Sequence, residues 1–415
     1  MQQIKKNIRI LFIARTIRLF AYGFISVILV LYLAAIGLKE YEIGVLLTLT
    51  LLGDVVISFW ITTNADNFSR RKMLIAGSIL MAAGGFIFVL TDNYIILVLT
   101  AAIGVISPSG KEIGPFLSIE QSALSELVPT KALPGVFAWY NLAGSFSTAI
   151  GALCAGWGAQ LLQKEGLTNI LTYKIILAIY GLIGLMLLIL FRVLTNQVEV
   201  PKTTDTAKTI SRFGLHSSKK IVIKLSALFA LDAFAGGFIL QSIIAYWFYL
   251  KFNVNTGSIG SIFFAANLIA GISSLYAIKI AGRLGLIKTM VFTHLPSNVL
   301  LLLVPLMPNL PSAIAMLLLR FSISQMDVPT RQTYTIIAVN KDERSAASGI
   351  TSIARSIGAS ISPSLGVIFL ASPALINLPF FFAGGLKIIY DIWLYHSFKE
   401  IKDGQEIGVK RTKVT

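Results

Sequence analysis

The sequence predicts an all-α membrane protein with twelve transmembrane helices, arranged as two pseudo-symmetric six-helix halves with both termini in the cytoplasm. Its composition indicates the class: of 415 residues, 55% are hydrophobic and only 13% are charged, about half of the charged fraction of a soluble domain. This composition excludes an ordinary soluble enzyme, a disordered chain and a nucleic-acid-binding domain. The apolar runs indicate the number of helices, and the basic residues indicate their orientation.

Apolar runs of about 20 residues, long enough to cross a hydrocarbon core of about 30 Å, recur along the whole chain. We expect twelve spans, each placed to within a few residues. They cover residues 9–36, 42–64, 72–91, 94–127, 135–161, 171–193, 221–250, 257–280, 288–307, 311–339, 346–370 and 374–397. The first run is longer than the apolar segment of a secretory signal, so we expect it to be the first helix.

Lysine and arginine are concentrated on one side of these spans. The loops on that side hold Lys5, Lys6, Arg9, Arg70, Arg71, Lys72, Lys219, Lys220, Arg283, Lys288, Lys341 and Arg344. The opposite loops hold little beyond Lys39, Lys164 and Lys251. Because cytoplasmic loops carry the excess of basic residues, we place the termini in the cytoplasm. The net charge of +16 is then mainly a signal of orientation, and it favours contact with anionic lipid head groups.

One long polar segment divides the chain. Residues 195–220 are rich in Thr, Ser and Lys and follow the sixth span. We interpret them as a cytoplasmic linker between a half at 1–194 and a half at 221–398, with a cytoplasmic tail at 399–415. A regulatory segment is the alternative interpretation of the linker.

The two halves resemble each other, as an internal repeat would. Residues 21–24 (AYGF) match 235–238 (AGGF), and Ile43-Gly44 matches Ile259-Gly260. These matches share an offset of 214 to 216 positions. Parallel repeats of six spans, with a site between them near the middle of the membrane, are typical of secondary transporters.

A loop motif lies between the second and third spans, at residues 62–72 (TTNADNFSRRK). It resembles G-x-x-x-D-R-x-G-R-R/K, the loop motif of the major facilitator superfamily. Asp66, Arg70 and Arg71 match, whereas both glycines and the first basic residue are replaced. The resemblance covers nearly the whole chain and implies a monomer that transports a solute by alternating access, with these three residues as a cytoplasmic gate. The alternative is that the basic residues only set the topology, but an anchor needs no acid.

Two further runs, 293–298 (THLPSN) and 325–332 (QMDVPTRQ), resemble a widespread prokaryotic branch of the superfamily that is described as efflux-type permeases. Gly349, Gly358 and Gly366 also follow the spacing of the superfamily's antiporter motif, although tight helix packing is the simpler interpretation. The branch implies a multi-pass protein of the cytoplasmic (inner) membrane of a prokaryote, and it indicates no substrate.

Ionisable residues inside spans cost about 2.5 to 3.5 kcal/mol each on insertion scales, so we expect them to face a partner or a water-filled cavity. The candidates for coupling and substrate binding in the central cavity are Arg18, Glu112, Glu120, Asp232, Asp327 and Arg331. With a repeat offset that ranges from 211 to 216 positions, Arg18 aligns with Asp232. Glu120 aligns with Arg331, so the two halves carry opposite signs at equivalent positions.

Opposite charges at equivalent positions would allow ion pairs between the halves to form in one state of the transport cycle and to open in another. The alternative is that these residues form permanent buried ion pairs. The static interpretation is strongest for Asp327 and Arg331, which lie four residues apart on one helical face. Arg15 lies nearer the cytoplasmic end, where its side chain can extend to the lipid surface. His294 is interpreted as a hydrogen-bonding residue in helix packing.

The fourth span is interrupted by residues 107–110 (SPSG) and by Gly114-Pro115, with Lys111 and Glu112 between the two breaks. Discontinuous helices are the best sequence indication of a transporter site. We therefore expect the break to line the cavity, with a simple proline kink as the alternative.

Few residues in the sequence could support a disulfide, a metal site or catalysis. The single cysteine, Cys154, excludes a disulfide scaffold, and three scattered histidines argue against a metal site. We expect no enzyme, no cofactor and no ATP-driven transport, since a Walker motif is missing from the sequence.

The sequence thus predicts a secondary transporter of a small amphipathic or anionic organic solute, with H⁺ as the coupling ion. Glu120, Asp232 and Asp327 are the candidate proton carriers. Arg18 and Arg331 would pair with them in the empty state. Proton-coupled export is our first choice, and proton-coupled uptake or uniport is the alternative. A non-transporting sensor on a transporter fold is the alternative from another class.

Overall fold

The computed structural model describes residues 2–129, 132–199, 215, 218–340 and 343–398, without the side chains of residues 61–68, 134, 278 and 345. Within these residues the regular elements are all helical. Most of the expected linker and the whole expected tail lie outside the described residues.

The N-terminal half contains seven α-helices that form six spans. They are α1 (Gln2–Ala35), α2 (Glu40–Phe68), α3 (Arg70–Leu90), α4 (Tyr94–Ile103), α5 (Phe116–Leu127), α6 (Leu133–Lys164) and α7 (Asn169–Arg192). The fourth span consists of α4 and α5, with an irregular segment between them. A short 3₁₀ helix, η2 (Asn196–Val198), follows α7 and packs against the same half.

The C-terminal half contains the equivalent spans. They are α8 (Lys219–Gly237) with α9 (Gln241–Phe252), α10 (Thr256–Leu284), α11 (Leu286–Leu303) with η3 (Val304–Leu306), α12 (Leu310–Ser324) with α13 (Asp327–Ile337), α14 (Arg344–Leu370) and α15 (Leu378–Phe398). In the described part of the chain, ten segments are long and apolar enough to cross a membrane. The fourth and tenth spans are missing from these ten because each is broken into two short helices, so the predicted total of twelve is confirmed.

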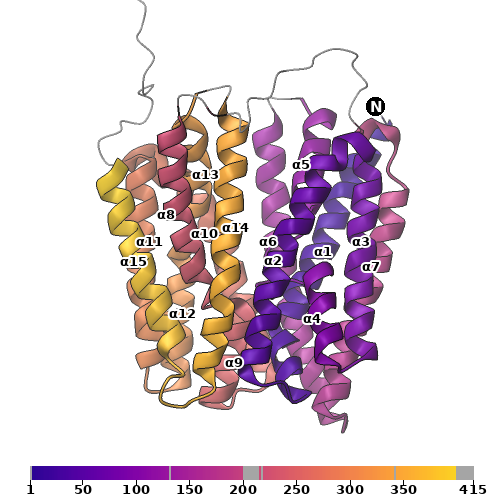
Figure 1. Ribbon diagram of the computed structural model, residues 1–415, viewed down its shortest axis with the longest axis vertical. Helices are drawn as coiled ribbons and strands as arrows, with labels where there is room; N and C mark the ends of the chain where they lie inside the picture. Colours follow the sequence, from indigo (N-terminus) through magenta and orange to yellow (C-terminus); the bar gives the residue numbers. More distant parts are fainter. Residues whose placement is uncertain (1, 130–131, 200–214, 216–217, 341–342, 399–415) are drawn as a thin grey trace, which may run out of the picture.

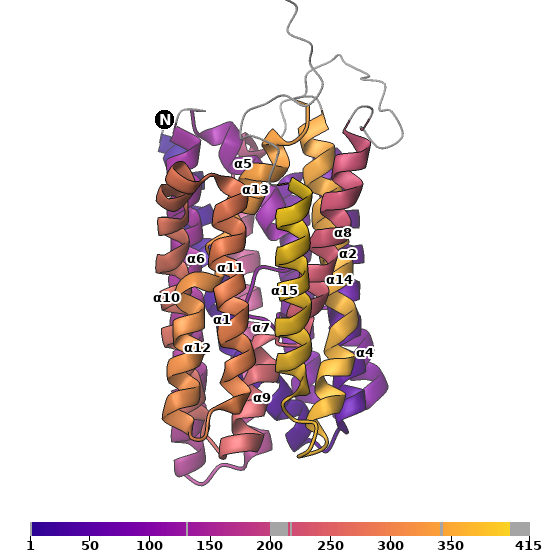
Figure 2. The same ribbon diagram turned by 90° about the vertical axis from the view of Figure 1, so that its left-hand side faces the viewer.

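The two halves lie side by side along their length (Figure 1). The helix α1 begins and α15 ends at the same end of the bundle, which we call the terminal end (Figures 1 and 2). The helices α4 and α9 lie toward the opposite end, which we call the far end. Packing repeats between the halves, because α1 packs on α6 as α8 packs on α14.

Glycines allow the spans to approach closely. A Cβ on Gly358 of α14 would lie 2.3 Å from the carbonyl oxygen of Ala230 in α8, and a Cβ on Gly23 of α1 would lie 2.1 Å from that of Thr148 in α6. Ser362 donates to the carbonyl of Phe234 in the same α8–α14 contact. These contacts favour the packing interpretation for Gly358, whereas Gly349 has no neighbour within 4 Å of an added Cβ.

Contacts between the halves are concentrated toward the far end. The pairs are α2 with α14 and α6 with α10, and Gly156 and Gly260 meet so closely that a Cβ on Gly156 would lie 2.7 Å from the other Cα. Gln241 of α9 donates to Ser26 of α1 at 2.8 Å. Among the described residues, α5 and α13 at the terminal end make no extended contact with each other. The halves are therefore held together mainly at the far end.

Candidate functional site

The fourth span is broken at mid-depth, as the sequence predicts. Gly110 and Gly114 adopt φ of 67° and 77°, values that glycine adopts without steric cost. Backbone groups of this segment bond to side chains of other spans: Tyr22 donates to the carbonyl of Ile113 at 3.2 Å, and Asp54 accepts from the N–H of Gly114 at 2.6 Å. Non-helical backbone inside a membrane needs such partners.

The break of the fourth span also meets the break of the seventh. The N–H of Ser242, near the start of α9, donates to the carbonyl of Pro108 at 3.1 Å. Irregular backbone from the two halves is therefore in direct contact. Since a helix can bend where its hydrogen bonds are interrupted, this contact joins two points at which the spans can bend.

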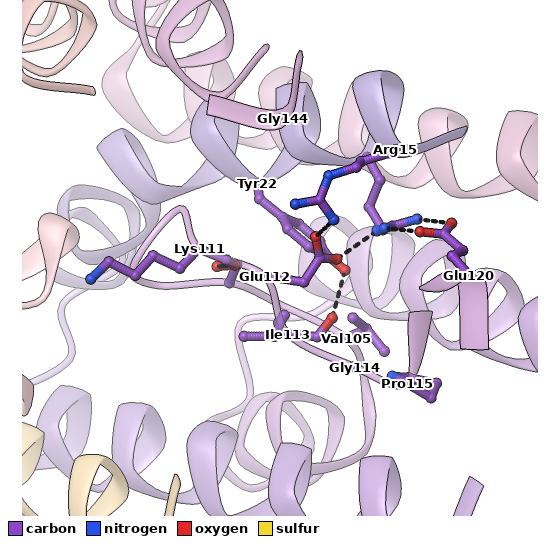
Figure 3. A network of polar contacts seen from close by, with 12 residues as sticks. Arg15, Tyr22, Val105, Lys111, Glu112, Ile113, Gly114, Pro115, Glu120 and Gly144 are labelled. Atoms are coloured by element: carbon purple, nitrogen blue, oxygen red, sulfur yellow. Dashed lines mark hydrogen bonds and ion pairs between the residues drawn. The ribbon is translucent and has the colours of Figure 1, made fainter. Parts of the chain in front are cut away.

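Four residues form what we call the N-terminal charge cluster: Arg15, Arg18, Glu112 and Glu120. Figure 3 shows Arg15, Glu112 and Glu120 close together. Arg18 is fully buried and binds both carboxylate oxygens of Glu120, at 2.6 Å each. Its Nε also donates to Glu112 at 2.9 Å. Tyr140 donates a further hydrogen bond to Glu120. Bidentate pairs between arginine and carboxylate are among the strongest polar contacts in proteins.

Arg15 belongs to the same cluster, so the alternative that it extends to the lipid surface is wrong. Its side chain is buried and donates to Glu112 at 2.9 Å, to Asn141 at 3.1 Å and to the carbonyl of Tyr140 at 2.8 Å. The guanidinium also lies 4.3 Å from the centre of the Tyr140 ring, within the range of a cation–π contact. Arg15 therefore fixes Glu112 beside Arg18.

A second group, the C-terminal charge cluster, comprises Asp232, His294, Asp327, Arg331, Arg355, Lys387 and Asp391. Asp232 of α8 is its centre and is 3% exposed. Lys387 lies 2.5 Å from its carboxylate, Arg355 3.1 Å, Arg331 3.5 Å and His294 3.8 Å. These four neighbours come from α15, α14, α13 and α11, so one carboxylate joins five spans of this half.

The rest of the C-terminal charge cluster surrounds this centre. Asp327 and Arg331 form the expected pair on α13, at 2.5 Å. On the opposite side, His294 Nδ1 lies 2.8 Å from Asp391, and Asn298 donates to the other oxygen of Asp391 at 2.8 Å. His294 therefore stands between the carboxylates of Asp232 and Asp391.

The structure thus brings together the six residues expected in the cavity, but within each half. Arg18 pairs with Glu120 in one half, and Asp232 lies near Arg331 in the other. The signs are exchanged between equivalent positions, as the repeat offset indicates. Among the described contacts, no ion pair joins Arg18 to Asp232 or Glu120 to Arg331.

Sequence reasoning missed Lys387 and Asp391 and set His294 aside. Lys387 and Asp391 had a signal, because both are ionisable residues well inside the predicted span 374–397. His294 does form hydrogen bonds in helix packing, as interpreted, but its partner is a carboxylate of the cluster.

The loop motif of residues 62–72 lies at the terminal end, and its arginines contact residues of the same half. Arg70 and Arg71 donate from their guanidinium groups to the carbonyls of Val198 and Leu194, at 3.3 and 3.1 Å. Glu199 accepts from the N–H of Arg70 at 2.7 Å. Asp66 falls in α2, but its side chain lies outside the described residues. Glu199 is a partner of the motif that the sequence did not indicate.

An apolar groove of about 490 Å³ runs between α8 and α14. Leu231 and Ala354 line it, and each precedes a charged residue of the C-terminal charge cluster, Asp232 and Arg355.

A helical bundle of two equivalent halves, with charged groups gathered at broken spans, is the architecture of a secondary transporter. The comparisons agree with this class. The chain belongs to the Major Facilitator Superfamily, because the sequence model of that family matches residues 11–395. An uncharacterized membrane protein of Saccharomyces cerevisiae is 28% identical over 418 residues, which cover 94% of this chain and 93% of the relative.

Several solved structures share the fold. A bacterial homologue of the human lysosomal transporter Spinster, inward-facing and unoccupied, has a TM-score of 0.69 at 14% identity and covers 95% of each chain. A D-xylose–proton symporter has a TM-score of 0.72 at 14% identity, and the match covers 94% of this chain and 97% of the symporter. The nucleoside transporter NupG has a TM-score of 0.70 at 13% identity, and the match covers 96% of this chain and 100% of NupG. The family and these neighbours indicate a membrane transporter and not an enzyme.

Proposed function

We propose that this protein is a secondary active transporter that moves a small organic solute across a membrane by alternating access. The observation that carries the proposal is the pair of charge clusters at mid-depth in two equivalent halves that are held together mainly at the far end. Broken fourth, seventh and tenth spans beside these clusters supply the points at which the halves can bend.

The orientation follows from the charges of the loops. Since the terminal end carries the basic loops, it corresponds to the cytoplasm. Halves joined at the far end then describe a conformation that opens toward the cytoplasm. We place the protein in the cytoplasmic membrane of a prokaryote as a monomer, on the resemblance of residues 293–298 and 325–332 to prokaryotic permeases.

Proton coupling is the second part of the proposal. Glu120, Asp232 and Asp327 are carboxylates at mid-depth, and each pairs with a cation. Asp232 is the favoured carrier because it shares several cations from moving spans, so its partners can change between states. A proton that neutralises Asp232 would release Lys387 and Arg355 from it.

Export is the favoured direction, on the resemblance to efflux-type permeases. Proton-coupled uptake is the second candidate, supported by the similarity in fold to a D-xylose–proton symporter. A non-transporting sensor would bind a solute without moving it.

The test is proton movement in liposomes that contain the purified protein and a pH-sensitive dye, under an imposed proton gradient. A panel of organic anions, cations, sugars and drugs is added in turn. Solute-dependent proton movement supports coupled transport and shows its direction. Saturable binding without any flux would support the sensor instead.

Asp232→Asn tests the carrier. The variant should lose proton-driven transport and retain counterflow exchange of the same solute, which also shows that it is folded. Asp92→Asn is the matched control, because Asp92 is half exposed and pairs with Lys174 at the surface, at 2.9 Å. Unchanged dependence of the Asp232 variant on the pH gradient would contradict the assignment.

The gate formed by Asp66, Arg70 and Arg71 is a further proposal. Asp66→Ala should slow the transport cycle and leave the affinity for the solute unchanged. A variant with weaker binding and a normal cycling rate would show that the motif does not act as a gate.

A further inference from the structure

In the break of the fourth span, the ammonium of Lys111 has no partner among the described residues. Its side chain extends away from Glu112 and the rest of the N-terminal charge cluster (Figure 3). It is exposed although it lies at mid-depth, and its ammonium makes no hydrogen bond or ion pair with any described residue. The charges that act on it most strongly are Lys387, Arg355, Asp327 and Arg320. Lys111 therefore extends from the N-terminal half toward the C-terminal charge cluster.

Arg320 is a second cation without an ion pair, and it is buried. It lies on α12, one turn before the break of the tenth span, and is 7% exposed. Its Nε is buried without a hydrogen-bond partner, and the guanidinium has a ring contact with Phe321 at 5.1 Å but no ion pair within the described chain. Asp232 and Asp327 act on it only from a distance.

A buried charge without a partner is costly, and the cost falls when a counter-charge binds. In and beside the C-terminal charge cluster, lysine and arginine outnumber the carboxylates by five to three. The cations are Lys111, Arg320, Arg331, Arg355 and Lys387, and the carboxylates are Asp232, Asp327 and Asp391. Arg331 and Lys387 are engaged by carboxylates at 2.5 Å. Arg355 pairs with Asp232 through one nitrogen, and its side chain is 31% exposed.

We propose that Lys111, Arg320 and Arg355 form a binding site for the anionic group, a carboxylate or a phosphate, of a small organic anion. This inference rests on the proposed function, because it names the class of solute that the transporter binds. Arg320 and Arg355 supply planar donors from the C-terminal half, which suit both groups. Lys111 supplies a flexible ammonium from the N-terminal half, so a bound anion would connect the two halves.

The test measures ligand binding through the melting temperature of the purified full-length protein in detergent. A ligand that binds the folded state raises this temperature, and the increase grows with the logarithm of its concentration relative to its Kd. The probes are benzoate, succinate and glycerol 3-phosphate, each beside its uncharged counterpart benzamide, succinamide or glycerol. The two carboxylates and the phosphate separate the two possible anionic groups.

Two variants and one control make the test specific. Lys111→Gln and Arg320→Met should each weaken the binding of the anion by about tenfold or more, as expected for the loss of one charge-assisted contact. Lys224→Gln, at an exposed position of α8, should bind as the parent protein does.

Arg320→Met has a second readout that a purely structural arginine would not give. Because the charge of Arg320 has no ion pair among the described residues, its removal should raise the melting temperature without ligand and reduce the increase caused by the anion. A lower melting temperature of the empty variant would show that Arg320 supports the fold, and it would overturn the proposal.

Other results also decide the question. The proposal is overturned if no anion raises the melting temperature at millimolar concentration, if the uncharged counterpart binds as well, or if both variants bind like the parent. Binding is measured without transport, so a protein that binds an anion and moves no solute would retain this site and contradict the proposed transport. Flux of an uncharged solute without anion binding would support the proposed transport and overturn the proposed anion site.

Discussion

The two halves of this protein carry the same arrangement of charged spans with opposite signs, and they differ in how completely the charges are paired. In the N-terminal charge cluster, Arg18 is bound by both Glu112 and Glu120, and Arg15 completes the set. In the C-terminal charge cluster, several cations share Asp232, and Arg320 makes no ion pair with any described residue. A saturated cluster is suited to hold spans together, whereas an unsaturated one can exchange partners with a solute or a proton.

This comparison predicts that substitutions in the N-terminal charge cluster cost more stability than substitutions of cations in the C-terminal one. Arg18→Leu should show the largest effect, a loss of about 3 to 5 kcal/mol, because it leaves two buried carboxylates without their partner. The measurement is the free energy of unfolding in mixed micelles. Arg192→Leu, at an exposed site near the end of α7, should change it by less than about 0.5 kcal/mol.

An Arg18 variant as stable as the parent would show that the N-terminal charge cluster is not saturated as described. The comparison between the halves would then fail at its strongest point.

Tyr140→Phe sharpens the comparison with a smaller change. The hydroxyl of Tyr140 donates to Glu120, and a hydrogen bond to a charged group contributes about 1.5 to 3 kcal/mol. The same unfolding measurement should show a loss in that range. The control is Tyr395→Phe in α15, because the Tyr395 hydroxyl makes no hydrogen bond with any described residue. This variant should leave the free energy of unfolding almost unchanged.

Lys387→Met tests the C-terminal charge cluster in the same way. Asp232 keeps Arg355 at 3.1 Å and Arg331 at 3.5 Å after the change, so we expect a loss of only about 1 kcal/mol. A loss as large as that of Arg18→Leu would mean that the cations around Asp232 do not substitute for one another.

Glu199→Gln should have the smallest effect. Its carboxylate accepts from Ser69 at 2.6 Å and from the first N–H groups of α3. A carboxylate at a helix N-terminus contributes about 0.3 to 1 kcal/mol. Because Glu199 contacts neither charge cluster, the variant should leave solute binding unchanged, and weaker binding would link the terminal end to the site.

The sequence by itself determined the fold, because the constraint imposed by a membrane is simple. A span needs about 20 apolar residues whatever its neighbours are, so twelve runs and their basic loops were readable without any contact information. The break of the fourth span was also readable, since Gly114-Pro115 and residues 107–110 combine proline with glycine, and both disfavour a continuous helix. The residues Arg18, Glu112 and Glu120 were found because charges inside a span are rare and costly.

Only the tertiary structure decided which charges are paired. The sequence indicated that Arg18 and Asp232 are equivalent, but not that each pairs inside its own half, because pairing depends on how helices rotate and pack. The same reason explains why the sequence did not indicate the roles of Lys387 and Arg320. Their spans are known from the sequence, whereas the direction of each side chain is set by neighbouring helices. An ion pair depends on distances of a few ångströms, and apolar periodicity does not determine such distances.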